Sequence, residues 1–298
     1  MRKPRRFPFF ASSLVAVLGL AVAPAIRAAQ TPVYAPVVKL LSPGKDPKKP
    51  LRMTAKVGLR RTAVMRIKMG MEMTMGENKV RGILPEIRIT MDLNVTNVSA
   101  DGDIRYEVKV NKAEVLEDAQ VDKKDALVPK AALAEMLAEM RGMKGHVIVS
   151  SRGFTKEADL VIPPKMMDPE TKQFMEEIKQ SPYQMSSPLP EEAVGVGAKW
   201  LTTARVKQYG MVLKQSITSE LRSLSGDAAK VSSTIKLTGS AVGLKSFTSS
   251  GNGEMNLDLG RLIPSLATVH VTLRCIETMA QGQDMATKLD MTMGMQGK

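Results

Sequence analysis

Residues 65–75 read MRIKMGMEMTM, and a sulfur-bearing or aliphatic side chain falls on every second position of this stretch. These side chains belong to Met65, Ile67, Met69, Met71, Met73 and Met75. Successive residues of a strand point to opposite faces of a sheet, so a period of two predicts a strand with one apolar face and excludes an amphipathic helix. The fold is therefore expected to rest on strands.

The chain ends on a similar pattern, formed by Leu289, Met291, Met293 and Met295. If the two strands lie side by side, the first and last strands close the sheet and place Met71 and Met293 on one face. Methionine is adaptable, apolar and carries a thioether, so such a face has three interpretations. It is an ordinary core, a lining for a variable apolar ligand, or a Cu(I) site built from Met-x-Met strands.

The first 28 residues predict a secretory signal peptide. Basic side chains at positions 2, 3, 5 and 6 precede an apolar run from Leu14 to Ala25, and Ala28 or Ala29 supplies a small-residue cleavage site. The protein is expected to be exported to the periplasm or cell envelope. No later apolar segment approaches the length of a transmembrane helix, so no membrane span is expected after cleavage.

Charge and composition narrow the classes of partner. The full chain has a formal net charge of +13, and removal of residues 1–28 with their five basic side chains leaves +8. The charges are scattered singly, and only four Tyr, six Phe and one Trp are available to stack on bases. This pattern argues against dedicated nucleic-acid binding.

Cys275 is the only cysteine, so no intramolecular disulfide can form. It follows Val269, Val271 and Leu273 on alternate positions of an apolar strand. The pattern therefore predicts a buried, unreactive thiol.

Proline content and periodicity divide the mature chain into four regions. Residues 29–50 are rich in proline and are expected to form an extended arm without sheet donors. Residues 51–164 predict a first antiparallel β half with a helix at 130–141, and residues 165–196 a connector that contains a second helix. Residues 197–298 predict a second antiparallel β half.

The clearest local elements lie in the first half. Alternating runs at 87–95 and 104–110, joined by the turn Asp101-Gly102-Asp103, predict a hairpin with one apolar and one wet face. After Pro129, an apolar stripe at helical spacing predicts a short helix that covers the sheet and ends at Gly142; it contains Leu133, Met136, Leu137 and Met140.

Two short sequence strings in the first half recur in similar form and in the same order in the second half, which suggests that the halves arose by duplication. The turn at residues 224–227 resembles that at 98–103. The string Ser249-Ser250-Gly251 leading to Leu262-Ile263-Pro264 resembles Ser150-Ser151-Arg152-Gly153 leading to Val161-Ile162-Pro163.

No catalytic constellation is recognisable, and the chain is not expected to be an enzyme. His146 and His270 are the only histidines, and both fall in strand patterns. Nucleophile elbows, phosphate loops and dinucleotide fingerprints do not occur. No cofactor is expected, and an undetected hydrolase remains an alternative.

The layout resembles uncharacterised families of exported bacterial proteins, some of which are similar to lipoprotein carriers. The resemblance rests on the order of elements and on two strings, Ser249-Ser250-Gly251-x-Gly253 and Asp258-Leu259-Gly260. It implies a curved antiparallel sheet that wraps an apolar cavity plugged by helices. It assigns no functional residue, and the chain lacks the lipid-attachment cysteine of relatives that are lipoproteins.

Together these observations predict an α+β, strand-dominated fold with a large curved antiparallel sheet, or sheets, from two similar halves and two short covering helices. The leading function is a non-catalytic envelope protein that binds an acyl chain, another lipid or an apolar part of a partner protein. The residues expected to form its binding face are Met69, Met71, Met73, Met291 and Met293. The alternatives are a structural envelope protein with a filled core and a Cu(I)-binding protein.

Overall fold

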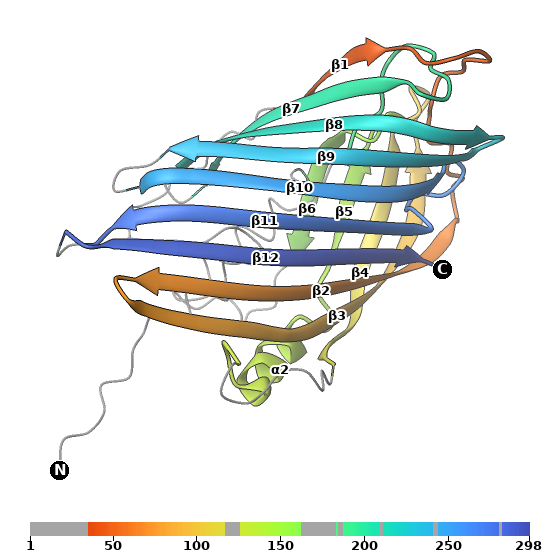
Figure 1. Ribbon diagram of the computed structural model, residues 1–298. Helices are drawn as coiled ribbons and strands as arrows, with labels where there is room; N and C mark the ends of the chain where they lie inside the picture. The colour runs from red at the N-terminus through yellow and green to blue at the C-terminus, as the bar shows by residue number, and fades with distance from the viewer. Residues whose placement is uncertain are drawn as a thin grey trace.

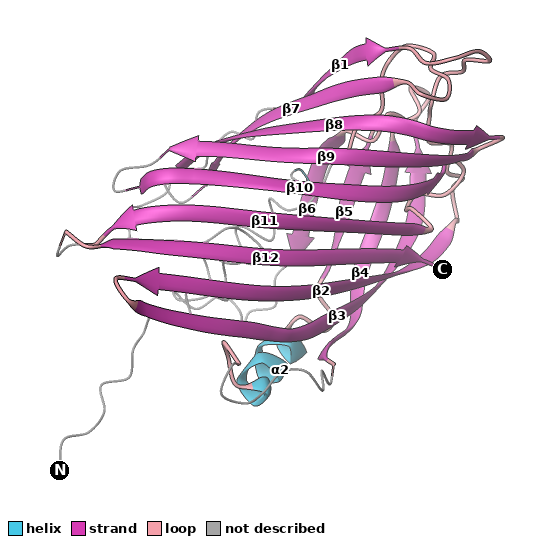
Figure 2. Ribbon diagram, viewed as in Figure 1, coloured by secondary structure: helices cyan, strands magenta, loops and turns pink. Residues whose placement is uncertain are grey.

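One antiparallel sheet of twelve strands forms the protein, with one helix among the described residues (Figures 1 and 2). The computed structural model describes residues 35–116, 126–161, 183, 187–208, 211–240, 244–279 and 282–298. The predicted strand-dominated antiparallel class is confirmed. The signal peptide falls on residues outside this description, as does most of the connector at 165–196 that is predicted to contain the second helix. Of the connector's described residues, Tyr183 is helical and 187–196 are not.

Long strands make up most of the described chain. Before the helix α2 (Lys130–Glu139) come β1 (Val37–Ser42), β2 (Arg60–Met75), β3 (Asn78–Val98) and β4 (Ile104–Val115). After it come β5 (Lys144–Val149), β6 (Thr155–Val161), β7 (Lys199–Gln208), β8 (Met211–Ser225), β9 (Ala228–Ser240), β10 (Leu244–Asp258), β11 (Leu266–Thr278) and β12 (Asp284–Gly297). The order in the sheet is β1-β7-β8-β9-β10-β11-β12-β2-β3-β4-β5-β6.

The sheet curls, so that β4, β5 and β6 lie behind the face formed by β7 to β12 (Figure 1). Residues 51–55 tie distant parts of the curl together. The amide of Met53 donates to the carbonyl of Ser151, in the turn between β5 and β6, and the amide of Thr54 donates to the carbonyl of Leu259, just after β10. These bonds, 2.7 Å each, hold two regions that are far apart in the order of strands.

The concave side of the curl, called the inner face below, carries the main core. Ile67, Met69, Leu273 and Leu289 pack there in one buried cluster with Leu133 and Leu137 of α2. The opposite side of the same strands, the outer face, carries charged and polar residues such as Lys68, Glu72, Lys288 and Asp290. Burial of the apolar face against α2 and the other wall of the curl is what favours this shape.

The hairpin and the first helix form as predicted. Strands β3 and β4 pair from Ile87 with Val115 to Val98 with Ile104, and Ile87, Ile89, Leu93 and Val95 are buried. The helix α2 follows Pro129 and buries Leu133 and Leu137. Its expected role of covering the sheet is confirmed, because both side chains belong to the sheet's core cluster.

Two expectations are corrected. The prediction that 29–50 offers no sheet strand is wrong for Val37–Ser42, which form β1 and pair with β7, since prolines flank this segment without interrupting it. The second pair of similar strings does not mark equivalent elements. Ser150–Gly153 forms the turn between β5 and β6, whereas Ser249–Gly251 lies inside β10. A shared Ser/Gly string therefore does not identify equivalent positions in the two halves.

Among the described helical residues, none forms a helix of the length and apolarity needed to cross a membrane.

Candidate functional site

The two methionine strands are neighbours. In the antiparallel register of β2 and β12, Met69 lies opposite Met291, Ile67 opposite Met293, and Met71 opposite Leu289. Met71 and Met293 therefore share the inner face, as the sequence predicts. The pair does not close the sheet, however: it joins the two halves in the middle of the strand order, and β1 and β6 stand at its ends.

The five predicted residues differ in burial. Met69 is only 4% exposed and belongs to the core cluster, whereas Met71, Met291 and Met293 are half-buried and pack against it. Met73, opposite Thr287, is also half-buried. These five residues are called the methionine patch below. An apolar patch in the middle of a twelve-stranded sheet is thus incompletely covered.

Strand β10 is separated from β12 by β11 and carries two glycines on its inner face. Gly251 lies opposite Val271, which in turn lies opposite Met291. In the adjacent cross-strand row, Gly253 lies opposite Val269, which lies opposite Met293. The two valines are half-buried, like the methionines beside them. Sequence reasoning did not assign Gly251 and Gly253 to this face, although their spacing of two in a strand was the available signal.

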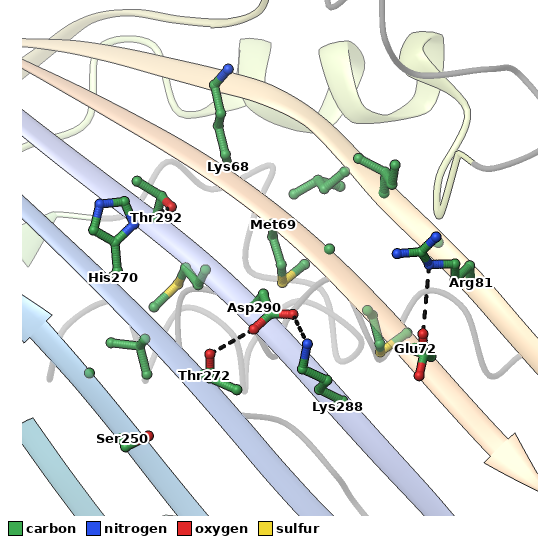
Figure 3. Close-up of a pocket in the computed structure, with 18 of the residues that line it drawn as sticks. Lys68, Met69, Glu72, Arg81, Ser250, His270, Thr272, Lys288, Asp290 and Thr292 are labelled. Carbon is green, nitrogen blue, oxygen red and sulfur yellow. Dashed lines mark hydrogen bonds and ion pairs between the residues drawn. The ribbon is translucent and has the colours of Figure 1, made fainter.

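A hollow of about 730 Å³ opens on the other side of the same strands (Figure 3). Its frame is made of outer-face side chains, including Lys68, Asp290 and Thr272, while Met69, Met71 and Met291 alternate with them along the strands. Gly70 also lines this hollow, and a Cβ atom placed on it would meet no atom within 4 Å. A second hollow of about 750 Å³ shares Asn252 and His270 with the first.

Charged groups around the first hollow neutralise one another. The Asp290 carboxylate accepts a hydrogen bond from the Thr272 hydroxyl at 2.7 Å and lies 2.7 Å from the Lys288 ammonium (Figure 3). Burial favours the neutral acid, but the hydrogen bonds from Lys288 and Thr272 outweigh it and keep the pKa of Asp290 below its ordinary value. The Glu72 carboxylate likewise forms an ion pair, with its Oε2 3.7 Å from Arg81 Nε.

The remaining chemically active side chains are separated. His146 Nε2 lies 2.7 Å from Glu157 on β6, and His270 Nδ1 lies 2.8 Å from the Thr292 hydroxyl. Cys275 is buried, and burial with the nearby Glu277 carboxylate raises the pKa of its thiol. In the part of the chain that the structure describes, no three or more His, Cys, Asp and Glu side chains gather in a group that could hold a metal ion.

No family model matches the chain, and a search of curated proteins finds no match.

Proposed function

We propose that this chain is a non-catalytic exported protein that binds an apolar ligand, an acyl chain or the apolar part of a partner, on the methionine patch. The observation that carries the proposal is the incomplete burial of Met71, Met291 and Met293 at the β2–β12 junction, far from either end of the strand order. Flexible thioether side chains adapt to ligands of varied shape.

The inner face suits such a ligand better than the hollows on the outer face. Charged, hydroxyl and amide side chains frame both hollows. An alkyl chain that entered one would have to displace their water and would gain only partial apolar contact, with side chains such as Met71 and Val271 in the first hollow and Leu266 in the second. On the inner face the half-buried side chains of Val269 and Val271 neighbour the patch and gain from the burial of additional apolar surface.

Further support comes from the shape and the first 28 residues. A curved antiparallel sheet with a helix packed on its inner core is the layout that the resemblance to lipoprotein carriers implies, and the predicted signal peptide would bring the chain to an envelope rich in acyl chains. The partner is accordingly a lipid or another envelope protein.

Native mass spectrometry of the purified mature chain tests the proposal. We expect an apolar species to accompany the wild-type protein, and a fluorescent apolar probe to bind after its removal. Met291→Gln places an amide within the patch and should weaken the binding of the probe at least fivefold. Thr292→Gln changes the next residue of β12, which faces the outer side, and should leave probe binding unchanged. A clean mass together with no probe binding would show a filled structural core instead.

Cu(I) binding is a second candidate because the register brings thioethers together. Side chains directly opposite in an antiparallel pair lie about 5 Å apart at Cβ, which is the relation of Met69 to Met291, and Met71 is a diagonal neighbour of Met291. The same mass spectrometry distinguishes the candidates: a gain of one copper ion under reducing conditions, lost in Met291→Gln, favours the thioether site.

A further inference from the structure

The two hollows of the outer face adjoin, because Asn252 and His270 line both of them. The first hollow crosses β10, β11, β12, β2 and β3, and the second crosses β7 to β11. Together they extend over eight neighbouring strands, or about 33 Å at the ordinary spacing of strands in a sheet. A ligand that occupies both hollows must therefore be an extended chain.

The charges that line the hollows are compensated. Each charged side chain of the lining has an opposite charge within 3.7 Å. Examples are Lys288 with Asp290 and Arg81 with Glu72 in the first hollow, and Arg222 with Glu220 in the second. An ionic ligand would have to break such a pair or bind beside it without a counter-charge of its own. The lining therefore favours a neutral ligand.

Uncharged hydrogen-bonding groups lie between the ion pairs. Five of them form one cross-strand row, called the polar row below: Thr218, Thr234, Asn252, His270 and Thr292. All but Thr292 are exposed. His270 Nδ1 lies 2.8 Å from the Thr292 hydroxyl, which leaves Nε2 available (Figure 3), and the Asn252 amide makes no side-chain hydrogen bond within the described chain. Hydroxyl, amide and imidazole groups both donate and accept hydrogen bonds.

We infer that the two hollows form one binding site for a neutral oligosaccharide that lies across the strands of the outer face. Sugar hydroxyls carry no charge, and each both donates and accepts hydrogen bonds, as the groups of the polar row do. Repeated sugar units match a row whose polar groups recur on every strand, about 4.8 Å apart. The site lies on the face opposite the methionine patch and does not depend on the apolar ligand proposed above.

Other chain-like ligands fit this lining less well. A nucleic acid needs uncompensated cations for its phosphates and aromatic side chains for its bases, and no Phe, Tyr or Trp is among the lining residues. An acidic polysaccharide would meet the same compensated charges. A peptide would place apolar side chains against charged, hydroxyl and amide groups, which would lose water without hydrogen bonds in return.

The test measures binding of the purified mature chain to an array of neutral and acidic oligosaccharides, from disaccharides to hexasaccharides. We expect neutral sugars to bind, and a hexasaccharide to bind about tenfold more tightly than the disaccharide of the same sugar, because only the longer chain reaches both hollows. Asn252→Ala should weaken binding about fivefold, the effect of losing one hydrogen bond. Asn97→Ala changes an exposed asparagine of β3 that lines neither hollow, and should leave sugar binding unchanged.

A second variant tests the position of the sugar. Gly70→Leu projects a side chain into the first hollow from a position where a Cβ meets no atom within 4 Å, and should reduce the affinity for the hexasaccharide toward that for the disaccharide. Urea titration shows whether the variants fold.

The outcomes separate this inference from the proposed function. Absence of binding to every neutral oligosaccharide, or tighter binding of the acidic ones, overturns the inference. Equal sugar binding by wild type, Asn252→Ala and Gly70→Leu also overturns it, because the sugar would then lie elsewhere. Binding of the apolar probe at the methionine patch is measured independently, so either proposal can fail without the other.

Discussion

Met69 lies directly opposite Met291, on the same face of neighbouring antiparallel strands, although 222 positions separate them in the chain. This pair fixes the junction of β2 with β12 at the centre of the sheet. It also makes the end of the chain indispensable, because β12 pairs with β11 on one side and with β2 on the other.

Removal of residues 284–298 should therefore abolish folding. The truncation deletes β12, separates β11 from β2 and removes the buried Leu289 from the core. A chain that begins at Pro43 loses only β1, which stands at one end of the strand order, and should keep a cooperative unfolding transition. Far-UV circular dichroism during urea unfolding distinguishes them; a cooperative transition in the chain lacking β12 would contradict the central placement.

Substitution at two strand glycines should have opposite effects. Gly70→Ala adds a Cβ in open space and should raise the free energy of unfolding by about 0.5–1 kcal/mol, because glycine inside a strand costs more backbone entropy. Gly251→Ala forces β10 away from β11 and should lower it by about 1–3 kcal/mol. Urea titration measures both, and equal effects would rule out the close approach at Gly251.

The methionines should contribute unequally to stability. Met69→Ala creates a cavity in the buried core and should lower the free energy of unfolding by about 2–4 kcal/mol. Met293→Ala, at a half-buried position, should cost about 1 kcal/mol. Saturating ligand should raise the stability of wild type more than that of Met293→Ala. Similar losses in the two variants without ligand would indicate that the patch is filled in the free protein.

Glu86 should make stability depend on acidic pH. Its side chain is 10% exposed and lies 3.0 Å from both Arg66 and Lys68. Burial opposes ionisation, but hydrogen bonds from Lys68 and Arg66 outweigh it and lower the pKa of the carboxyl from 4.5. Its stabilising contribution is therefore present above about pH 4.5 and is lost as the pH falls through the lowered value.

The matched comparison uses Glu86→Gln and Glu254→Gln, the latter at an exposed carboxylate paired with Lys230. At pH 7, Glu86→Gln should lower the free energy of unfolding by about 1–3 kcal/mol, and the difference from wild type should shrink toward pH 3. Glu254→Gln should change it by less than about 0.5 kcal/mol. A Glu86 effect independent of pH would mean that packing, not charge, is responsible.

Tyr106 should ionise late in alkaline titration. Burial raises its pKa to about 12, because the phenolate would be desolvated. The neutral side chain therefore stabilises the fold below the ordinary tyrosine value of 10, and this contribution is lost as the pH rises toward 12. Ultraviolet absorbance titration should show one late tyrosine in the wild type that Tyr106→Phe eliminates. Its persistence in the variant would assign it to another tyrosine.

Short-range patterns were sufficient for the local elements. Alternation predicts the β3–β4 hairpin and the two methionine strands, and the spacing of Leu133 and Leu137 predicts α2, because each pattern repeats the geometry of its own backbone. The same local view matched Ser249–Gly251 to the string Ser150–Gly153, which forms a turn, and gave 37–42 no strand. In both cases the deciding interactions, with β9 and β11 or with β7, come from elsewhere in the chain.

By itself, therefore, the sequence determined that Met71 and Met293 each lie on the apolar face of a strand, since side-chain alternation is a property of the strand alone. Only the tertiary structure decided that these strands meet at the centre of one curled sheet, that Met69 is buried while Met71 is not, and that the Ser249 hydroxyl has no partner. Strand order and burial depend on contacts between segments distant in sequence, which no local period encodes.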